Sequence, residues 1–325
     1  MKMSGRMIRF MVLFLVLQMI LISFYVPLLQ SSHGVIQPTQ PPPQKQVCQP
    51  QHFICPPSVL AKRNVMRHNK TLVYQQLGGS DTFHSQFWED WFLYTEFFHG
   101  ERYWGLEHTF IELGGYDGET GSNSYFFDKT LGWKGLLLEA STANYVLMEK
   151  ARLSRSVVTI HGAVCQSPRM LTLWGGQSLT ANNRKEANGL FHDDHESVCL
   201  CLSMTTYLEM IGKLANKTIE QIDYFSMDVE GQELEIIESH DWVRYPVFVV
   251  SLEVAVQPLL SGTETYQHEK RCALHQRGLC RWPFYDNFTP PLPVDQETKA
   301  TFARNNEIWV NPALFPVEKS VMNRA

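Results

Sequence analysis

The chain has 325 residues, which is enough for one large domain with accessory segments. Its formal net charge is −5, and it contains no long run of lysine or arginine. This balance argues against the electrostatic surface of a nucleic-acid-binding protein, so we expect no nucleic-acid partner.

An uncharged, mostly apolar stretch at 10–29 lies close to the N-terminus. About twenty apolar residues span a bilayer. Basic residues precede this stretch within 1–9, and none follows before Lys45. The positive-inside rule then predicts a single-pass signal anchor at 10–29, a cytosolic tail at 1–9 and a luminal body. A cleaved signal peptide is the alternative, because Ser31 and Ser32 could form a small-residue cleavage site.

The rest of the chain divides into a stem and a globular part. Residues 31–57 are rich in proline and glutamine and poor in apolar residues, so they cannot pack a core. We therefore expect a stem and linker at 30–73 and one luminal domain at 74–325. Three N-glycosylation sequons agree with a luminal body. They begin at Asn69, Asn216 and Asn287.

Seven cysteines fit an oxidising compartment. Two local disulfides are the candidates by sequence distance. They would join Cys48 to Cys55 and Cys272 to Cys280. The connectivity of the remaining cysteines stays open, and an odd number leaves at least one thiol unpaired within the chain.

Helices and strands are expected to alternate along the globular part. The expected helices cover 85–94, 122–131, 141–153, a short segment from 206, and 231–239. The expected strands cover 109–113, 134–139, 156–164, 198–204, 222–227 and 247–252, with weaker candidates at 280–284 and 307–310. The polar segment 166–196 is typical of an insertion or a long hairpin over one edge of the sheet. This alternation predicts a doubly wound, mostly parallel α/β sheet of Rossmann-like type.

The strand at 109–113 runs into the glycine turn 114–118, and the next strand ends in Glu139. Glycines at such a turn let the backbone approach a nucleoside, and an acid at the next strand tip can accept hydrogen bonds from both ribose hydroxyls. Tyr116 stands where a dinucleotide-binding turn has its second glycine, and the sequence contains no phosphate-binding loop. A nucleoside without a pyrophosphate fits best, and S-adenosylmethionine is the candidate.

A second acidic pair, Asp228 and Glu230, follows the strand at 222–227. Open α/β sheets bind ligands at this edge. Either carboxylate could accept a proton from a substrate or hold a divalent cation. Alternatively, both could simply stabilise the N-terminus of the next helix. The acidic and histidine-rich stretch 192–196 matches no zinc pattern, so we predict no metal site there.

Several segments, in their order and spacing, resemble the FkbM-type methyltransferase family over about residues 83–310. They read SQFWEDWFLYTEFF, FIELGGYDGETGSNSYFF, GWKGLLLEAS, SMTTYL and IDYFSMDVEGQELEII. The resemblance implies a Rossmann-like methyltransferase fold that binds S-adenosylmethionine, with O-methylation as the activity of bacterial members. The N-terminal anchor adds a similarity to the animal Star-like branch, which implies a role in moving membrane cargo along the secretory pathway.

The resemblance also implies roles for individual residues. The implied cofactor-binding residues are Glu112, Gly114, Gly115, Asp117, Gly118 and Glu139. The implied catalytic residues are Asp228 and Glu230. Further candidates are Gln86, Asp90 and Asn123. The chain departs from the family pattern at Glu112, where many members carry aspartate, and after Glu139, where many carry proline.

The leading hypothesis is a membrane-anchored luminal methyltransferase that transfers a methyl group to a glycan, lipid or protein hydroxyl. We expect it in the endoplasmic reticulum or Golgi, with the endosome and plasma membrane as further locations. One alternative is a non-catalytic Star-like protein that binds membrane cargo. Another is a Golgi glycosyltransferase, which the anchor and the D-x-E sequence favour but the nucleoside pattern opposes.

Overall fold

The computed structural model describes a body that begins at Cys48. The described residues are 48–49, 53–63, 66, 69–154, 156–174, 179–180, 196–215, 219–229, 231–254, 263–288, 290–291 and 306–315. The chain divides into two units, Met1–Val47 and Cys48–Ala325. The predicted tail, anchor and first part of the stem lie outside the described residues, as do Asn216 and Glu230. Within the described part of the chain, no helix is long and apolar enough to cross a membrane.

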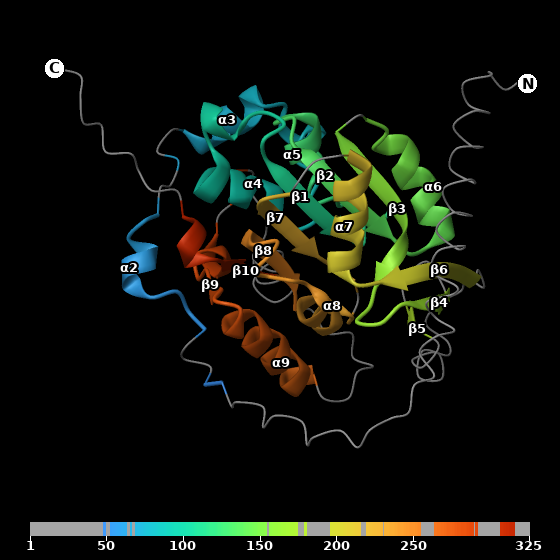
Figure 1. The fold of residues 1–325 in the computed structure, drawn as a ribbon. Coiled ribbons are helices and arrows are strands. Elements are labelled where there is room, and N and C mark those ends of the chain that lie inside the picture. The colour runs from blue at the N-terminus through green and yellow to red at the C-terminus, as the bar shows by residue number, and fades with distance from the viewer. Residues whose placement is uncertain are drawn as a thin grey trace, which may run out of the picture. The chain divides into compact units, whose positions relative to one another are not determined.

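The described strands form one ten-stranded sheet in the order β5-β4-β6-β3-β2-β1-β7-β8-β10-β9 (Figure 1). Their bounds are β1 Thr109–Leu113, β2 Lys134–Glu139, β3 Val157–Val164, β4 Arg169–Trp174, β5 Leu179–Thr180, β6 Glu196–Leu202, β7 Ile222–Met227, β8 Val247–Glu253, β9 Cys280–Arg281 and β10 Asn306–Val310. The strands from β6 to β8 in this order are parallel. The edge strands β4, β5, β10 and β9 pair antiparallel with their neighbours.

Helices cover both faces of the sheet. Their bounds are α2 Pro57–Leu60, α3 Lys70–Gln76, α4 Glu89–Leu93, α5 Tyr125–Lys129, α6 Thr142–Ala151, α7 Met204–Ala215, α8 Glu233–Ser239 and α9 Thr263–Gln276. Side chains of α4, α5 and α6 join Phe110 in one core cluster, whereas α7, α8 and α9 join Ile111 in the other. Successive residues of a strand point to opposite faces, so both faces of β1 are buried, as expected for a central parallel strand.

The strands β1, β2 and β7 have the predicted bounds. The helix α6 begins after Ser141, whose Oγ accepts a hydrogen bond from the Asn144 N–H. The first helix differs from its prediction. Trp88 has a left-handed φ of 66°, so α4 begins only at Glu89 and continues as a π-turn through Phe98. The helix α7 also begins earlier, at Met204.

The predicted disulfide pairs are wrong. The bonds are Cys55–Cys280 and Cys165–Cys201. The reason is tertiary pairing: the Cys55 N–H donates to the Arg281 carbonyl, and the Arg281 N–H donates to the Phe53 carbonyl. These contacts bring Cys55 beside Cys280, although the two residues lie 225 positions apart.

Two predicted glycosylation sites lie among the described residues. Asn69 is the exposed N-cap of α3, where its side-chain oxygen accepts a hydrogen bond from the Leu72 N–H. Asn287 ends the helical turn Tyr285–Asn287. Neither position tests whether a glycan is attached, so glycosylation stays a prediction.

Candidate functional site

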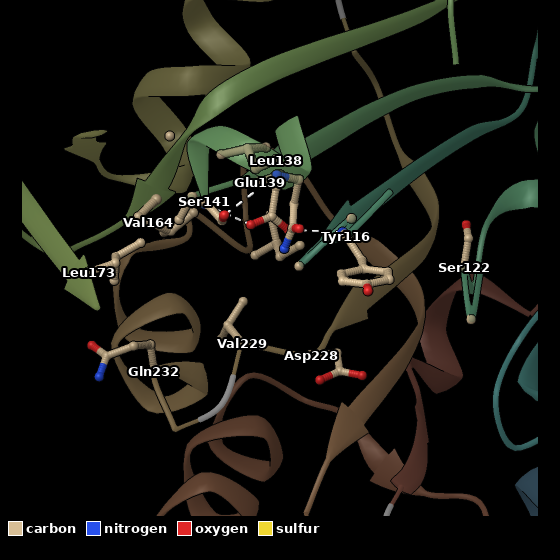
Figure 2. Close-up of a pocket in the computed structure, with 18 of the residues that line it drawn as sticks. Tyr116, Ser122, Leu138, Glu139, Ser141, Val164, Leu173, Asp228, Val229 and Gln232 are labelled. Carbon is tan, nitrogen blue, oxygen red and sulfur yellow. Dashed lines mark hydrogen bonds between the residues drawn. The ribbon is translucent and has the colours of Figure 1, made fainter. Parts of the chain in front are cut away.

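A cavity of about 600 Å³ lies at the carboxyl ends of β1, β2 and β7 (Figure 2). The strand β1 lies between β2 and β7, so the order of the strands reverses at this point. Open α/β sheets bind ligands at such a switch point. Gly114, Gly115, Tyr116, Glu139 and Asp228 all line the cavity. The structure therefore brings together the main predicted residues of the glycine turn and the two strand tips that follow.

Two glycines of the turn lie in close contact with their neighbours. Gly114 has a φ of 79°, and a Cβ atom there would lie 1.9 Å from the carbonyl oxygen of Asp228. A Cβ atom on Gly115 would lie 2.4 Å from the sulfur of Met148 on α6. Both glycine N–H groups donate to the Leu138 carbonyl at 3.1 Å. A side chain at Gly114 would thus push β1 and β7 apart at the floor of the cavity.

Glu139 is the buried acid of the cavity, and only 8% of its surface is exposed. Its Oε2 accepts the Tyr116 N–H at 2.8 Å and its Oε1 accepts the Ser141 N–H at 2.7 Å (Figure 2). Burial raises the pKa of Glu139, and hydrogen bonds from the backbone N–H groups of Ser141, Tyr116 and Ala140 oppose the shift. The two carboxylate oxygens together offer about four acceptor positions, more than these backbone contacts use, so the carboxylate can still accept a hydrogen bond from a ligand.

Tyr116 adopts a strained backbone conformation at the mouth of the cavity. Its φ is 46°, a left-handed value that is uncommon for an aromatic residue. Its side chain is 52% exposed beside the cavity (Figure 2). This conformation directs the Tyr116 N–H to Glu139. Strain of this kind is concentrated at functional sites, where the surrounding contacts compensate for it.

Glu112 does not line the cavity, in contrast to the role that the family resemblance implies. Its carboxylate accepts hydrogen bonds from the hydroxyls of Ser122 and Ser124 and pairs with Arg152 at 3.3 Å. Arg152 is fully buried and also pairs with Asp128 at 2.9 Å. Glu112 therefore belongs to a buried ionic network that holds the chain after the glycine turn.

Three other candidates also lie outside the cavity lining. The Asp117 carboxylate accepts hydrogen bonds from the backbone N–H groups of Glu119 and Thr120. Gly118 has a φ of 83° and packs against Arg152 and Met148. Asn123 donates from its side chain to the Ser226 hydroxyl at 3.0 Å. These residues shape the turn and connect it to β7.

Asp228 lines the cavity on the side opposite Glu139 (Figure 2). The helix α8 begins at Glu233 with Gln232 at its N-cap, so Asp228 does not occupy the cap position. The helix α9 holds the loop between Asp228 and α8, because the Tyr266 hydroxyl donates to the Gly231 carbonyl at 2.6 Å. Glu233 accepts the Gly231 N–H at 3.0 Å. Its other oxygen pairs with the buried Lys270.

The loop before α4 forms a further wall of the cavity. His84 and Gln86 both line it, so the predicted candidate Gln86 reaches the site and His84 is a residue that the sequence reasoning missed. Asp90 is fully buried and accepts the N–H groups of His84 and Ser85. Burial raises the pKa of Asp90, and its hydrogen bonds with Ser85 oppose the shift. Asp90 thus positions the loop without facing the cavity.

The remaining lining separates into a polar and an apolar part. Further polar lining residues are Thr120, Ser122, Ser141, Asn144 and Gln232. Apolar lining residues include Val164, Leu171, Leu173, Val229 and Ile236. Among the residues that the structure describes, no group of three or more histidine, cysteine or acidic side chains could hold a metal ion. Asn144 and the β4 residues carried no recognisable signal in the sequence, because they reach the cavity only through the fold.

Residues 112–270 match the family described as Methyltransferase FkbM domain, so this part of the chain is an FkbM methyltransferase domain. Similar solved structures include the methyltransferase FkbM from Methylobacillus flagellatus KT, with 7% identity, a TM-score of 0.37, and coverage of 80% of this chain and 58% of that chain. A human methyltransferase 10 domain containing protein has 11% identity and a TM-score of 0.31, with coverage of 79% of this chain and 86% of that chain. A fibrillarin/Nop5p complex has 10% identity and a TM-score of 0.29, with coverage of 62% of this chain and 71% of that chain. Comparison with curated proteins gives no match.

Proposed function

We propose that this protein is an S-adenosylmethionine-dependent methyltransferase whose cofactor binds in the cavity between β1, β2 and β7. The observation that carries the proposal is Glu139, a buried carboxylate whose two oxygens are oriented by backbone N–H groups beside the glycine turn. The carboxylate keeps acceptor capacity beyond these contacts, which suits the hydroxyls of a ribose. The FkbM domain match supports the same cofactor.

The other walls of the cavity also fit this cofactor. The apolar side chains of Val164, Leu171 and Leu173 suit a nucleobase, whereas the polar side with Thr120 and Ser122 suits the amino-acid end. A volume of about 600 Å³ falls within the usual range for cofactor sites. When bound, S-adenosylmethionine supplies an electrophilic methyl group. The residues of the chain then have to align an acceptor with it and remove the acceptor proton.

We assign the acceptor side of the cavity to His84, Gln86 and Asp228. Asp228 is the candidate proton acceptor because its carboxylate faces the cavity from a loop that α9 holds in place. His84 and Gln86 would orient the acceptor from the loop that Asp90 positions. Among the described residues that line the cavity, none is lysine or arginine. This lining suits a neutral hydroxyl better than a phosphorylated acceptor, which basic side chains would bind.

We further propose that the protein is a single-pass type II membrane protein with its domain in the lumen of the endoplasmic reticulum or Golgi. The uncharged stretch 10–29 with basic residues before it supports this topology. Two disulfides within the domain suit an oxidising compartment. Protease added to sealed microsomes should spare the domain, and digestion of the domain would contradict the proposed orientation.

Asp228→Asn separates chemistry from folding. The substitution keeps the size of the side chain and removes its charge, so we expect the free energy of unfolding to change by no more than about 1 kcal/mol. Transfer of labelled methyl groups from S-adenosylmethionine to secretory-pathway membranes should be lost, while cofactor binding measured by calorimetry persists. Wild-type protein that binds no S-adenosylmethionine at millimolar concentration would contradict the proposal and favour a Star-like role in cargo transport.

A further inference from the structure

Cys48, at the start of the described body, lies beside Cys272. Cys272 is on α9, and its thiol forms a hydrogen bond with Cys48. Gln276, one helical turn further along α9, directs its side-chain N–H to the Cys48 sulfur at 3.6 Å. Both cysteines are half-buried and pack against the same apolar cluster. The two sulfur atoms are thus held together by contacts on one face of α9.

A neighbouring disulfide already joins the same two segments. Cys55–Cys280 links the chain after Cys48 to the strand that follows α9. Between these cysteines, the Phe53 ring packs against His268 and His275 of α9, with ring centroids 5.6 and 5.9 Å apart. Cys48 and Phe53 therefore both lie against α9.

We propose that Cys48 and Cys272 form a third disulfide of the mature protein. In this step the two thiols lose two protons and two electrons, and a sulfur–sulfur bond forms between them. The electrons reduce a disulfide of a thiol–disulfide oxidoreductase, or of oxidised glutathione, to two thiols. The bond would leave Cys199, which is buried, as the cysteine outside the three pairs.

The reactivity of Cys272 fits enzyme-catalysed oxidation. Burial raises the pKa of the Cys272 thiol to about 11, and the neighbouring Cys48 adds to the shift. Little Cys272 thiolate is therefore present at neutral pH, and spontaneous attack by this thiol on a disulfide is slow. An oxidoreductase of the secretory pathway removes this barrier, because it presents a disulfide with a good leaving group.

The consequence of the bond is local. Cys55–Cys280 already closes nearly the same long loop, so a second bond closes only a short additional ring and restricts the unfolded chain little further. However, it fastens the first described residue to the helix that holds the Asp228 loop through Tyr266. The helix α9 would then be bonded covalently to Cys48 and would also contact the loop on the acceptor side of the cavity.

Tryptic mapping tests the proposal on full-length protein made through a secretory pathway. The protein is denatured in an alkylating reagent without reductant and then digested. One peptide, 46–62, contains both Cys48 and Cys55, whereas Cys272 and Cys280 fall in the separate peptides 272–277 and 278–281. If the proposal holds, disulfides join all three peptides into one species. Cys48→Ala should release 272–277 in alkylated form and keep 46–62 joined to 278–281. Cys199→Ala is the control and should leave this species intact.

Three results would overturn the proposal. The first is alkylation of both Cys48 and Cys272 in the wild-type protein. The second is a link between 272–277 and 278–281 alone, which local pairing would give. The third is release of Cys280 instead of Cys272 by Cys48→Ala, which crossed pairing would give. The proposal rests on the proposed luminal orientation. The mapping needs no cofactor and no methyl transfer, so its outcome is independent of the proposed methyltransferase activity.

Discussion

Glu112 and Glu139 come from neighbouring strands of one sequence motif, yet the fold places their carboxylates in two different environments. Glu112 is 3% exposed and shares a buried cluster with the guanidinium of Arg152 and two serine hydroxyls. Glu139 is 8% exposed and hydrogen-bonds with two backbone N–H groups at the edge of the cavity. The two acids are therefore similarly buried, but only Glu139 is available to a ligand in the cavity.

The difference follows from the donors around each acid. Glu112 is one residue before the end of β1 and faces the helical layer that supplies Arg152 from the C-terminus of α6. Its charge is neutralised inside the protein, so it stabilises the fold. Glu139 is the last residue of β2, and no cation of the described residues pairs with it. Its charge is stabilised only by backbone dipoles, which makes it suitable for binding hydroxyl groups.

The largest expected effect is a loss of stability when the ionic network around Glu112 is disrupted. Arg152→Met would leave Glu112 buried without its cation and Asp128 with Lys129 alone. We therefore expect the free energy of unfolding to fall by about 3–5 kcal/mol. Chemical denaturation measures the change. Arg169→Met is the matched control, because Arg169 pairs with Glu235 on the surface and should cost less than about 1 kcal/mol. Equal losses in the two variants would show that the buried network contributes no more than a surface pair.

Local sequence signals predicted the elements of the site well. Short, mostly apolar runs predicted β1, β2 and β7, which are parallel strands in the middle of the sheet. The glycine turn and the strand-tip acids Glu139 and Asp228 reach the cavity because the carboxyl ends of parallel strands meet at one edge. These features depend on short segments and on sheet geometry alone.

Features that depend on distant partners were not predictable in this way. Glu112 follows the cofactor motif, but its role is decided by Arg152, which lies 40 residues further along the chain. Cysteine spacing favoured local bonds, whereas β9 brings Cys280 to Cys55. His84 reaches the cavity because the buried Asp90 holds its loop. Each of these contacts arises from tertiary packing, which no local pattern encodes.

A smaller effect is expected on cofactor affinity when Glu139 is changed. Glu139→Gln removes the charge that strengthens hydrogen bonds from ribose hydroxyls, which together contribute roughly 2–4 kcal/mol. We expect the affinity for S-adenosylmethionine, measured by calorimetry, to fall by about thirtyfold, with a change of about 1 kcal/mol in the free energy of unfolding. Glu112→Gln should show the reverse pattern, with lower stability and nearly unchanged affinity. If both variants lose affinity equally, the distinction between the two acids fails.

The smallest expected effect is the pH dependence that titration of Glu139 causes. Burial raises the pKa of this carboxyl above the ordinary value of 4.5, so protonation in the folded state begins at a higher pH than in the unfolded chain. As pH falls through the raised pKa, the penalty of a buried charge disappears and the contribution of Glu139 to stability improves.

Cofactor affinity should change in the opposite direction. The protonated acid loses acceptor strength toward ribose hydroxyls, so we expect the affinity for S-adenosylmethionine to fall by up to about tenfold between neutral pH and about pH 5. Calorimetry over this range measures the change, and Glu139→Gln should remove it because the amide does not titrate. If the variant keeps the full pH dependence of the wild type, another group controls binding, and Glu139 is not the ribose-binding acid.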